Sequence, residues 1–289
     1  MYLTPLAKQL ARGNIKLIIY YLYEYIQILI ITERKIIMFN TAQFYAADTL
    51  NIFTDASVSG NYTGYGAIAL GNIKVIDNNP DSIITKIAAD VEPGTNNLGE
   101  IKAIRLGVLL ALELKRTHNI NRIHLFSDSK ISIMGLRNWC LNWMKYYKDG
   151  VLYKNSSCTE TVANQEIFLS IIKTIIENNL NIDLYHCRGH INYKNSAMMQ
   201  NALTSFYESN GFYITNQVLV SIVCANDAID NYTRLELTDT LNKINRDGGT
   251  IKPINRLYTN TGYDYNMELY KKLIGNSRKR ILDNYFQRR

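Results

Sequence analysis

The pattern of apolar and polar residues divides the chain into segments of different character. Residues 15–32 (IKLIIYYLYEYIQILIIT) are an almost continuous apolar run. Glu24 interrupts this run, which is also short for a bilayer span of about 20 residues. We therefore expect residues 1–48 to form an N-terminal helical extension, with the apolar run buried against the rest of the protein or a partner and not in a membrane.

From residue 49 onward the pattern becomes that of strands and helices in alternation. Short apolar runs separated by turn residues predict three antiparallel strands, at 51–57, 65–70 and 73–77. Helical spacing of apolar residues predicts helices at 98–115, 131–143 and 164–177, and further strands fall at 122–127 and 181–187. This order predicts an α/β fold, a mixed five-stranded sheet with helices on both faces. We place this domain at residues 49–240.

The excess positive charge of the chain is concentrated near its C-terminus. The formal net charge is +7, and residues 241–289 hold 11 Lys/Arg against 4 Asp/Glu, which leaves the first 240 residues neutral. We treat 241–289 as a basic C-terminal tail. The four cysteines lie far apart and suggest neither a zinc cluster nor a disulfide scaffold. Because no small-residue cleavage site follows the apolar run, we expect a cytoplasmic protein, with organellar targeting as the alternative.

Four acidic residues fall at the ends of predicted elements: Asp55, Glu100, Asp128 and Asp230. Two of them, Asp55 and Asp128, end strands that we expect to be neighbours. Carboxylates that meet without a partner repel one another and raise each other's pKa, so such an arrangement favours bound divalent cations. Oxygen ligands of this kind suit Mg²⁺ or Mn²⁺.

The motifs around these acids resemble those of the type 1 ribonuclease H family over about residues 50–235. The first hairpin follows the family's D-G-S, G-N and G-Y-G-A pattern, with Asp55-Ala56-Ser57, Gly60-Asn61 and Gly64-Tyr65-Gly66-Ala67. The later matches are Thr95-Asn96-Asn97 followed by Glu100, Asp128-Ser129, Arg188-Gly189-His190, and Asn226 followed by Asp230. All of them occur in the family's order, which makes the combination far more specific than any one motif.

The resemblance implies an endonuclease that hydrolyses the RNA strand of an RNA/DNA hybrid by two-metal-ion catalysis. It implies that two Mg²⁺ ions, replaceable by Mn²⁺, are held by Asp55, Glu100, Asp128 and Asp230. It also implies that His190, on a loop, assists proton transfer or product release. We expect substrate contacts from Ser57, Asn61, Thr95, Asn96, Asn97 and Asn226.

The largest departure from the family lies between His190 and Asp230, where about 35 residues replace a short loop. Within this insertion, at about 191–225, we predict a helix at 196–209 and a strand at 213–223, which would form a lid or a partner surface. Asp230 is then expected near the start of a late helix. Because of this insertion, the sequence does not decide whether Asp227 or Asp230 is the fourth metal ligand.

Two other functions remain open at this point. One is a DNA-cutting nuclease of the resolvase or exonuclease type on the same fold, although Ser57 stands where proofreading exonucleases carry a second acid. The other is a non-catalytic nucleic-acid-binding protein. In each case the basic tail is expected to contact the nucleic acid backbone, with four interleaved tyrosines available for stacking on bases: Tyr263, Tyr265, Tyr270 and Tyr285.

Overall fold

The computed structural model describes residues 38–39, 44, 46, 48–72, 83–247 and 265–274. The apolar run at 15–32 and the predicted strand at 73–77 lie outside these residues. Within the described ranges, no helix is both long and apolar enough to cross a membrane.

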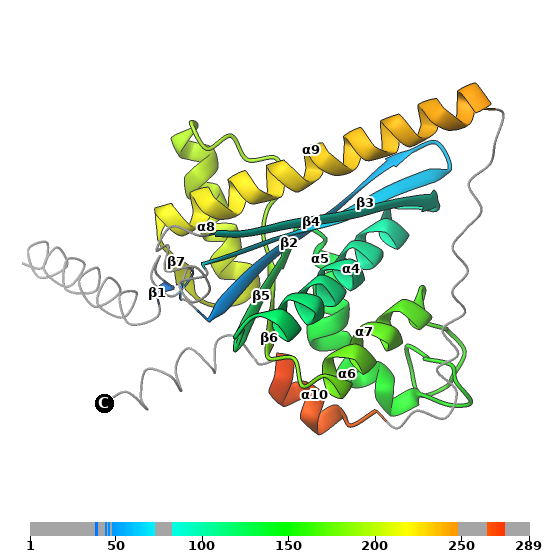
Figure 1. Cartoon of the computed structure of the whole chain (residues 1–289). Helices are drawn as coiled ribbons and strands as arrows, with labels where there is room; N and C mark the ends of the chain where they lie inside the picture. Colours follow the sequence, from blue (N-terminus) through cyan, green and yellow to red (C-terminus); the bar gives the residue numbers. More distant parts are fainter. Residues whose placement is uncertain are drawn as a thin grey trace, which may run out of the picture.

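Five strands form one mixed sheet in the order β4-β3-β2-β5-β6 (Figure 1). Their bounds are β2 Thr49–Ser59, β3 Tyr62–Asn72, β4 Ile83–Pro93, β5 Arg122–Ser127 and β6 Ile182–His186. The pairs β2–β3 and β3–β4 are antiparallel, whereas β5 runs parallel to both β2 and β6. The predicted mixed five-stranded sheet is confirmed. Its third strand is Ile83–Pro93, which the sequence pattern did not identify.

One face of the sheet is covered by α4 (Asn96–Thr117) and α7 (Gln165–Glu177), which lie on the opposite side from the long helix α9 (Asn216–Asp247) in Figure 1. A hydrophobic core lies on each face of the sheet: the first core under α4 and α7, and the second core on the opposite face. Side chains alternate along a strand, so Leu50 and Ile52 of β2 enter the first core while Phe53 enters the second. The predicted helix at 131–143 is broken into α5 (Lys130–Met134), a π-helical turn (Gly135–Trp139) and α6 (Cys140–Trp143), followed by a 3₁₀ turn at Met144–Tyr146.

The other face is covered by α8 (Ser196–Asn210) and α9 (Asn216–Asp247). The predicted helix of the insertion is confirmed, and Gly211 ends it. The predicted strand at 213–223 is wrong beyond its first two residues. Only β7 (Tyr213–Ile214) is extended, and it pairs in parallel with β1 (Met38–Phe39). Asp230 consequently lies in the middle of the long α9 and not near the start of a helix.

The insertion contributes to the second core. Phe206 and Phe212 are at most 3% exposed, and the rings of both pack against Tyr185 of β6. Asn210, at the end of α8, donates to the carbonyl of His186 at 2.8 Å and accepts from its N–H at 3.1 Å. The insertion therefore covers the edge strand β6. This packing explains why Phe206, Phe212 and Asn210 are buried, whereas the predicted lid over the acids does not.

Part of the basic tail also belongs to the core. Helix α10 (Met267–Ile274) packs against α7 and β6, and its Tyr270 is fully buried. The Tyr270 hydroxyl donates to the carbonyl of Leu136 at 2.9 Å. Tyr265 is 8% exposed. The prediction that these two tyrosines stack on bases is therefore wrong, because their rings are already packed against protein.

We expect Tyr270→Phe to lower the free energy of unfolding by about 1 kcal/mol, because a buried hydrogen bond is lost while the ring remains. Tyr270→Ala should cost about 3–5 kcal/mol through the cavity it leaves. Urea denaturation measures both values. Tyr193→Phe is the control, since Tyr193 is 49% exposed and should tolerate the change; equal effects at the two positions would show that α10 is not part of the core.

Candidate active site

Three carboxylates from separate elements meet at the end of the sheet. Asp55 lies on β2, Glu100 near the start of α4 and Asp128 directly after β5, and a carboxylate oxygen from each lies within 4.8 Å of the other two. The first and third meet because β2 and β5 are adjacent parallel strands, with Thr54 opposite Ser127. The predicted convergence of these acids is therefore present in the fold.

Glycine at position 99 brings Glu100 close to the strands. A Cβ at this position would lie 2.0 Å from Oγ1 of Thr63 and 2.9 Å from Cβ of Ala56. Such distances are impossible for a side chain, so only glycine lets the first turns of α4 pack directly on β2 and β3. Thr95 caps this helix, and its hydroxyl accepts from the N–H of Leu98 at 3.4 Å.

The three carboxylates are costly to ionise without a counter-charge. Burial, together with the charge of Asp128, raises the pKa of Asp55 to about 8. Burial and the charges of Asp128 and Asp55 raise the pKa of Glu100 to about 9. Oε2 of Glu100 is buried and has no hydrogen-bond partner among the described residues. An unpaired oxygen in a cluster of hard oxygen donors fits a divalent cation.

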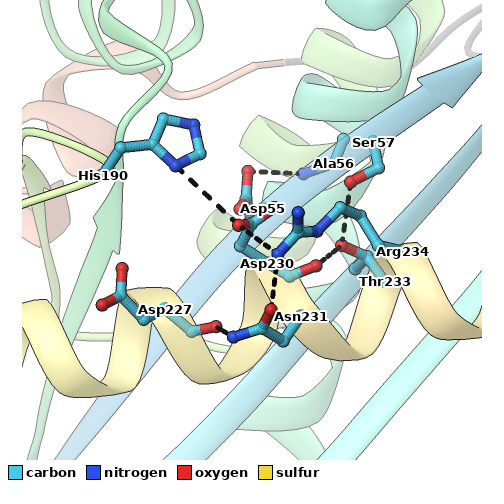
Figure 2. Close-up of polar contacts among 9 residues, drawn as sticks. All are labelled: Asp55, Ala56, Ser57, His190, Asp227, Asp230, Asn231, Thr233 and Arg234. Carbon is cyan, nitrogen blue, oxygen red and sulfur yellow. Dashed lines mark hydrogen bonds and ion pairs between the residues drawn. The ribbon is translucent and has the colours of Figure 1, made fainter.

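Asp230 reaches the same pocket from α9. In Figure 2 its side chain lies between those of His190 and Arg234, and Oδ2 is 3.9 Å from Nδ1 of His190 and 3.3 Å from Nη2 of Arg234. Asp230 lines the pocket together with the three clustered acids. Asp227 is not among the described residues that line it, which favours Asp230 as the fourth ligand.

The Arg188-Gly189-His190 segment wraps closely around Asp128. A Cβ on Gly189 would lie 2.2 Å from Oδ2 of Asp128, so a larger residue here would displace that carboxylate. His190 follows with a left-handed backbone (φ +53°) and a side chain that is 80% exposed at the pocket. Glycine at position 189 thus permits the close approach of this segment to Asp128.

Asn226 was predicted to contact substrate, and the structure gives it a different place. It is 2% exposed, and its Oδ1 accepts from the Cys187 thiol at 3.7 Å. Burial raises the pKa of Asp128, and the side chain of Asn226 opposes this rise. Because Asn226 is buried and does not line the pocket, the structure goes against the predicted substrate contact and places this residue beside Asp128 instead.

The remaining predicted substrate residues divide into two groups. Asn96 and Asn97 are exposed and line the pocket. The other three lie outside its lining: Ser57 shares a 3.4 Å hydroxyl contact with Thr233, Asn61 occupies the β2–β3 turn and Thr95 is the cap of α4. The sequence analysis missed Ala56 of the lining and three further lining residues: Ser129, Lys130 and Ile131. The position of the latter three directly after Asp128, at a helix start, was the available signal.

The sheet order, the two covered faces and the carboxylate pocket define a ribonuclease H-like α/β protein. The sequence profile of the RNase H family matches residues 47–203, more than half of the chain, and the protein belongs to this family.

Human Ribonuclease H1 is 32% identical over 96 residues, which are 33% of this chain and 29% of the human protein. The match therefore spans less than a third of that relative. Two solved structures are similar at low identity. LC9-RNase H1, a type 1 RNase H with the type 2 active-site motif, is 16% identical with a TM-score of 0.37, covering 62% of this chain and 85% of its own. LC11-RNase H1 in complex with an RNA/DNA hybrid is 16% identical with a TM-score of 0.33, and the match covers 51% of this chain and 89% of the LC11-RNase H1 chain.

We expect the metal-free protein to lose stability as pH rises from about 4 to about 8. Asp55 has a pKa of about 8 in the folded protein and an ordinary value of 3.8, so within this window the folded state retains a proton that the unfolded chain releases. Thermal denaturation in EDTA measures the trend. Asp55→Asn should flatten it, and Mg²⁺ added at pH 8 should raise the midpoint of the wild type more than that of the variant.

Asp239→Asn is the matched control, because Asp239 is an exposed carboxylate on α9 away from the pocket. It should reproduce the wild-type pH profile and the response to Mg²⁺. Identical profiles for the Asp55→Asn and wild-type proteins would contradict the electrostatic cost assigned to the cluster.

Proposed function

We propose that this protein is a metal-dependent endonuclease that hydrolyses the RNA strand of RNA/DNA hybrids. The observation that carries the proposal is the meeting of three carboxylates within 4.8 Å at one pocket, in a chain of the RNase H family. A purely structural or binding role gives no reason to keep three acids together at this electrostatic cost.

The ligands of the proposed cations are Asp55, Glu100, Asp128 and Asp230. The unpaired Oε2 of Glu100 and the all-oxygen donor set favour Mg²⁺ or Mn²⁺. Two such ions, when bound, supply an activated water and charge stabilisation for the leaving oxygen of the phosphodiester.

The other residues in or beside the pocket serve orientation and proton transfer. The Asn226 amide can hold the Asp128 carboxylate in place. His190 lies at the open side of the pocket, where an imidazole can deliver a proton to the leaving 3′-oxygen. Asn96 and Asn97 face the pocket from the start of α4, where their amides can bind the 2′-hydroxyls and base edges that distinguish RNA from DNA.

A cleavage assay on matched RNA/DNA, RNA/RNA and DNA/DNA duplexes with Mg²⁺ tests this function. We expect the RNA strand of the hybrid to be cut, and Asp128→Asn to lower kcat about 1,000-fold, equivalent to roughly 4 kcal/mol of transition-state stabilisation. Asp239→Asn should retain full activity, and circular dichroism should show that both variants are folded.

Three results would reject the proposal. Cutting of DNA/DNA alone would identify a DNA nuclease on the same fold, and equal cleavage by the Asp128→Asn protein would separate the activity from the carboxylate pocket. Binding of the hybrid without any cleavage at saturating Mg²⁺ and Mn²⁺ would indicate a binding protein.

The basic tail is proposed to contact the phosphate backbone of the hybrid. Because α10 is part of the core, the test is truncation after Ile274, which keeps α10 and removes five basic residues: Arg278, Lys279, Arg280, Arg288 and Arg289. We expect weaker hybrid binding and a slope of log K against log salt that is shallower by up to about 4.5, the value for five lost phosphate contacts on a duplex.

Replacing the same five residues by Gln in the full chain should reproduce the shallower slope, whereas Tyr285→Ala should leave it unchanged. Fluorescence anisotropy between about 50 and 200 mM salt covers the range in which such contacts are most apparent. A slope that is the same in the truncated and full-length proteins would show that the tail makes no phosphate contacts.

A further inference from the structure

The segment 191–225 holds a second pocket, separate from the carboxylates. It lies between α8 and the β7–α9 junction, and its lining includes Leu203, Thr204, Tyr207, Tyr213, Ile214 and Thr215. The rings of Tyr207 and Tyr213 stack with centroids 4.1 Å apart and form one wall. Aliphatic and aromatic side chains with a few hydroxyl groups make this pocket suited to apolar side chains with occasional polar atoms, such as tyrosine.

The chain's own N-terminal region enters the fold beside this pocket. Met38 pairs with Tyr213 and Phe39 with Ile214, so β1 lies alongside two residues of the lining. Phe44 is fully buried and packs on Phe126, and its carbonyl accepts from the Asn51 side chain at 2.7 Å. The start of the described chain is therefore attached to the fold both at β7 and at the second core.

The apolar run at 15–32 ends only six residues before Met38. Six residues reach at most about 20 Å even when fully extended. Fourteen of the 18 residues in the run are Ile, Leu or Tyr, and its only charged residues are Lys16 and Glu24. A run of this composition is strongly driven to leave water, and its tether holds it near the pocket at an effective concentration of the order of millimolar.

We propose that the pocket between α8 and β7 is the docking site for the apolar segment 15–32 of the same chain. The insertion then has two roles, since one face of α8 covers the sheet and the neighbouring face, with Leu203, Thr204 and Tyr207, receives the N-terminal segment. The segment's tyrosines match the mixed lining, because a tyrosine ring can fill the apolar part while its hydroxyl reaches Thr204 or Thr215.

Disulfide trapping in the full-length protein tests this contact. Cys158→Ser and Cys224→Ser remove the two cysteines that are not buried, leaving Cys140 and Cys187 inside the core. Leu22→Cys is then combined with Thr204→Cys at the pocket. Leu22 lies sixteen residues before Met38, so the tether alone gives it no preference for position 204 over position 201. The control pairs Leu22→Cys with Asn201→Cys, since Asn201 is exposed on the same helix but does not line the pocket.

We expect the intrachain disulfide of the Thr204→Cys protein to form at least tenfold faster than that of the Asn201→Cys protein under the same mild oxidation. Mass spectrometry of the cross-linked peptides identifies the pair. Ile28→Asp with Ile30→Asp, added to the Thr204→Cys protein, should reduce the rate to that of the control, with circular dichroism as the check that the domain is folded.

Three results would overturn the proposal. Equal rates at positions 204 and 201 would show that the pocket does not hold the segment. Cross-links between chains, detected by mixing two isotopically distinct proteins, would assign the pocket to a second copy. Loss of the cross-link with co-sedimentation on phosphatidylcholine/phosphatidylglycerol vesicles would assign the segment to a lipid surface. None of these readouts depends on nuclease activity.

Discussion

The parallel pairing of β2 with β5 is the constraint on which the rest of the protein depends. It places Asp55 and the residue after Ser127 at the same edge of the sheet, and α4 adds Glu100 through the close approach that Gly99 permits. The result is a cluster of buried carboxylates whose pKa values are raised by burial and by one another. The fold therefore holds together like charges that would separate in any looser arrangement, and the same feature makes the pocket selective for cations.

The sheet that holds these charges in place is covered by packed helices on both faces. On one face α4, α7 and α10 form the first core, and on the other α8 and α9 form the second. The segment between His190 and Asp230 and the C-terminal α10 both lie far in sequence from the three clustered acids Asp55, Glu100 and Asp128, yet each covers an otherwise open part of the sheet. Through Asn210 the insertion is hydrogen-bonded to His186, two residues upstream of the segment that wraps around Asp128. The packing of the insertion on β6 is thus linked to the position of the segment that lies against Asp128.

The parts of the fold that could be predicted are those with a strong local pattern. The strand at 122–127 and the helices at 98–115 and 164–177 have clear periodicity, and each is present with bounds close to those expected. The strand at Ile83–Pro93 was missed because its apolar and polar residues do not alternate regularly, and β3 provides the pairing that makes it extended. The apolar stretch at 213–223 resembles a strand, but it forms the first turns of α9, where Val218, Leu219 and Ile222 bury one helical face against the second core.

The sequence by itself identified Asp128 at the end of its strand and Glu100 near the start of its helix, because strand alternation and capping chemistry are local properties that a single chain segment displays. Asp55 was expected to end the first strand, but it lies inside β2, which continues to Ser59. It also determined the family, through motifs in a fixed order. Only the tertiary structure decided that Asn226 is buried, that Asp230 and not Asp227 lines the pocket, and that Tyr265 and Tyr270 are core residues. The physical reason is that burial and hydrogen-bond partners are supplied by segments distant in sequence, so the role of a polar or aromatic side chain depends on what the rest of the chain packs against it.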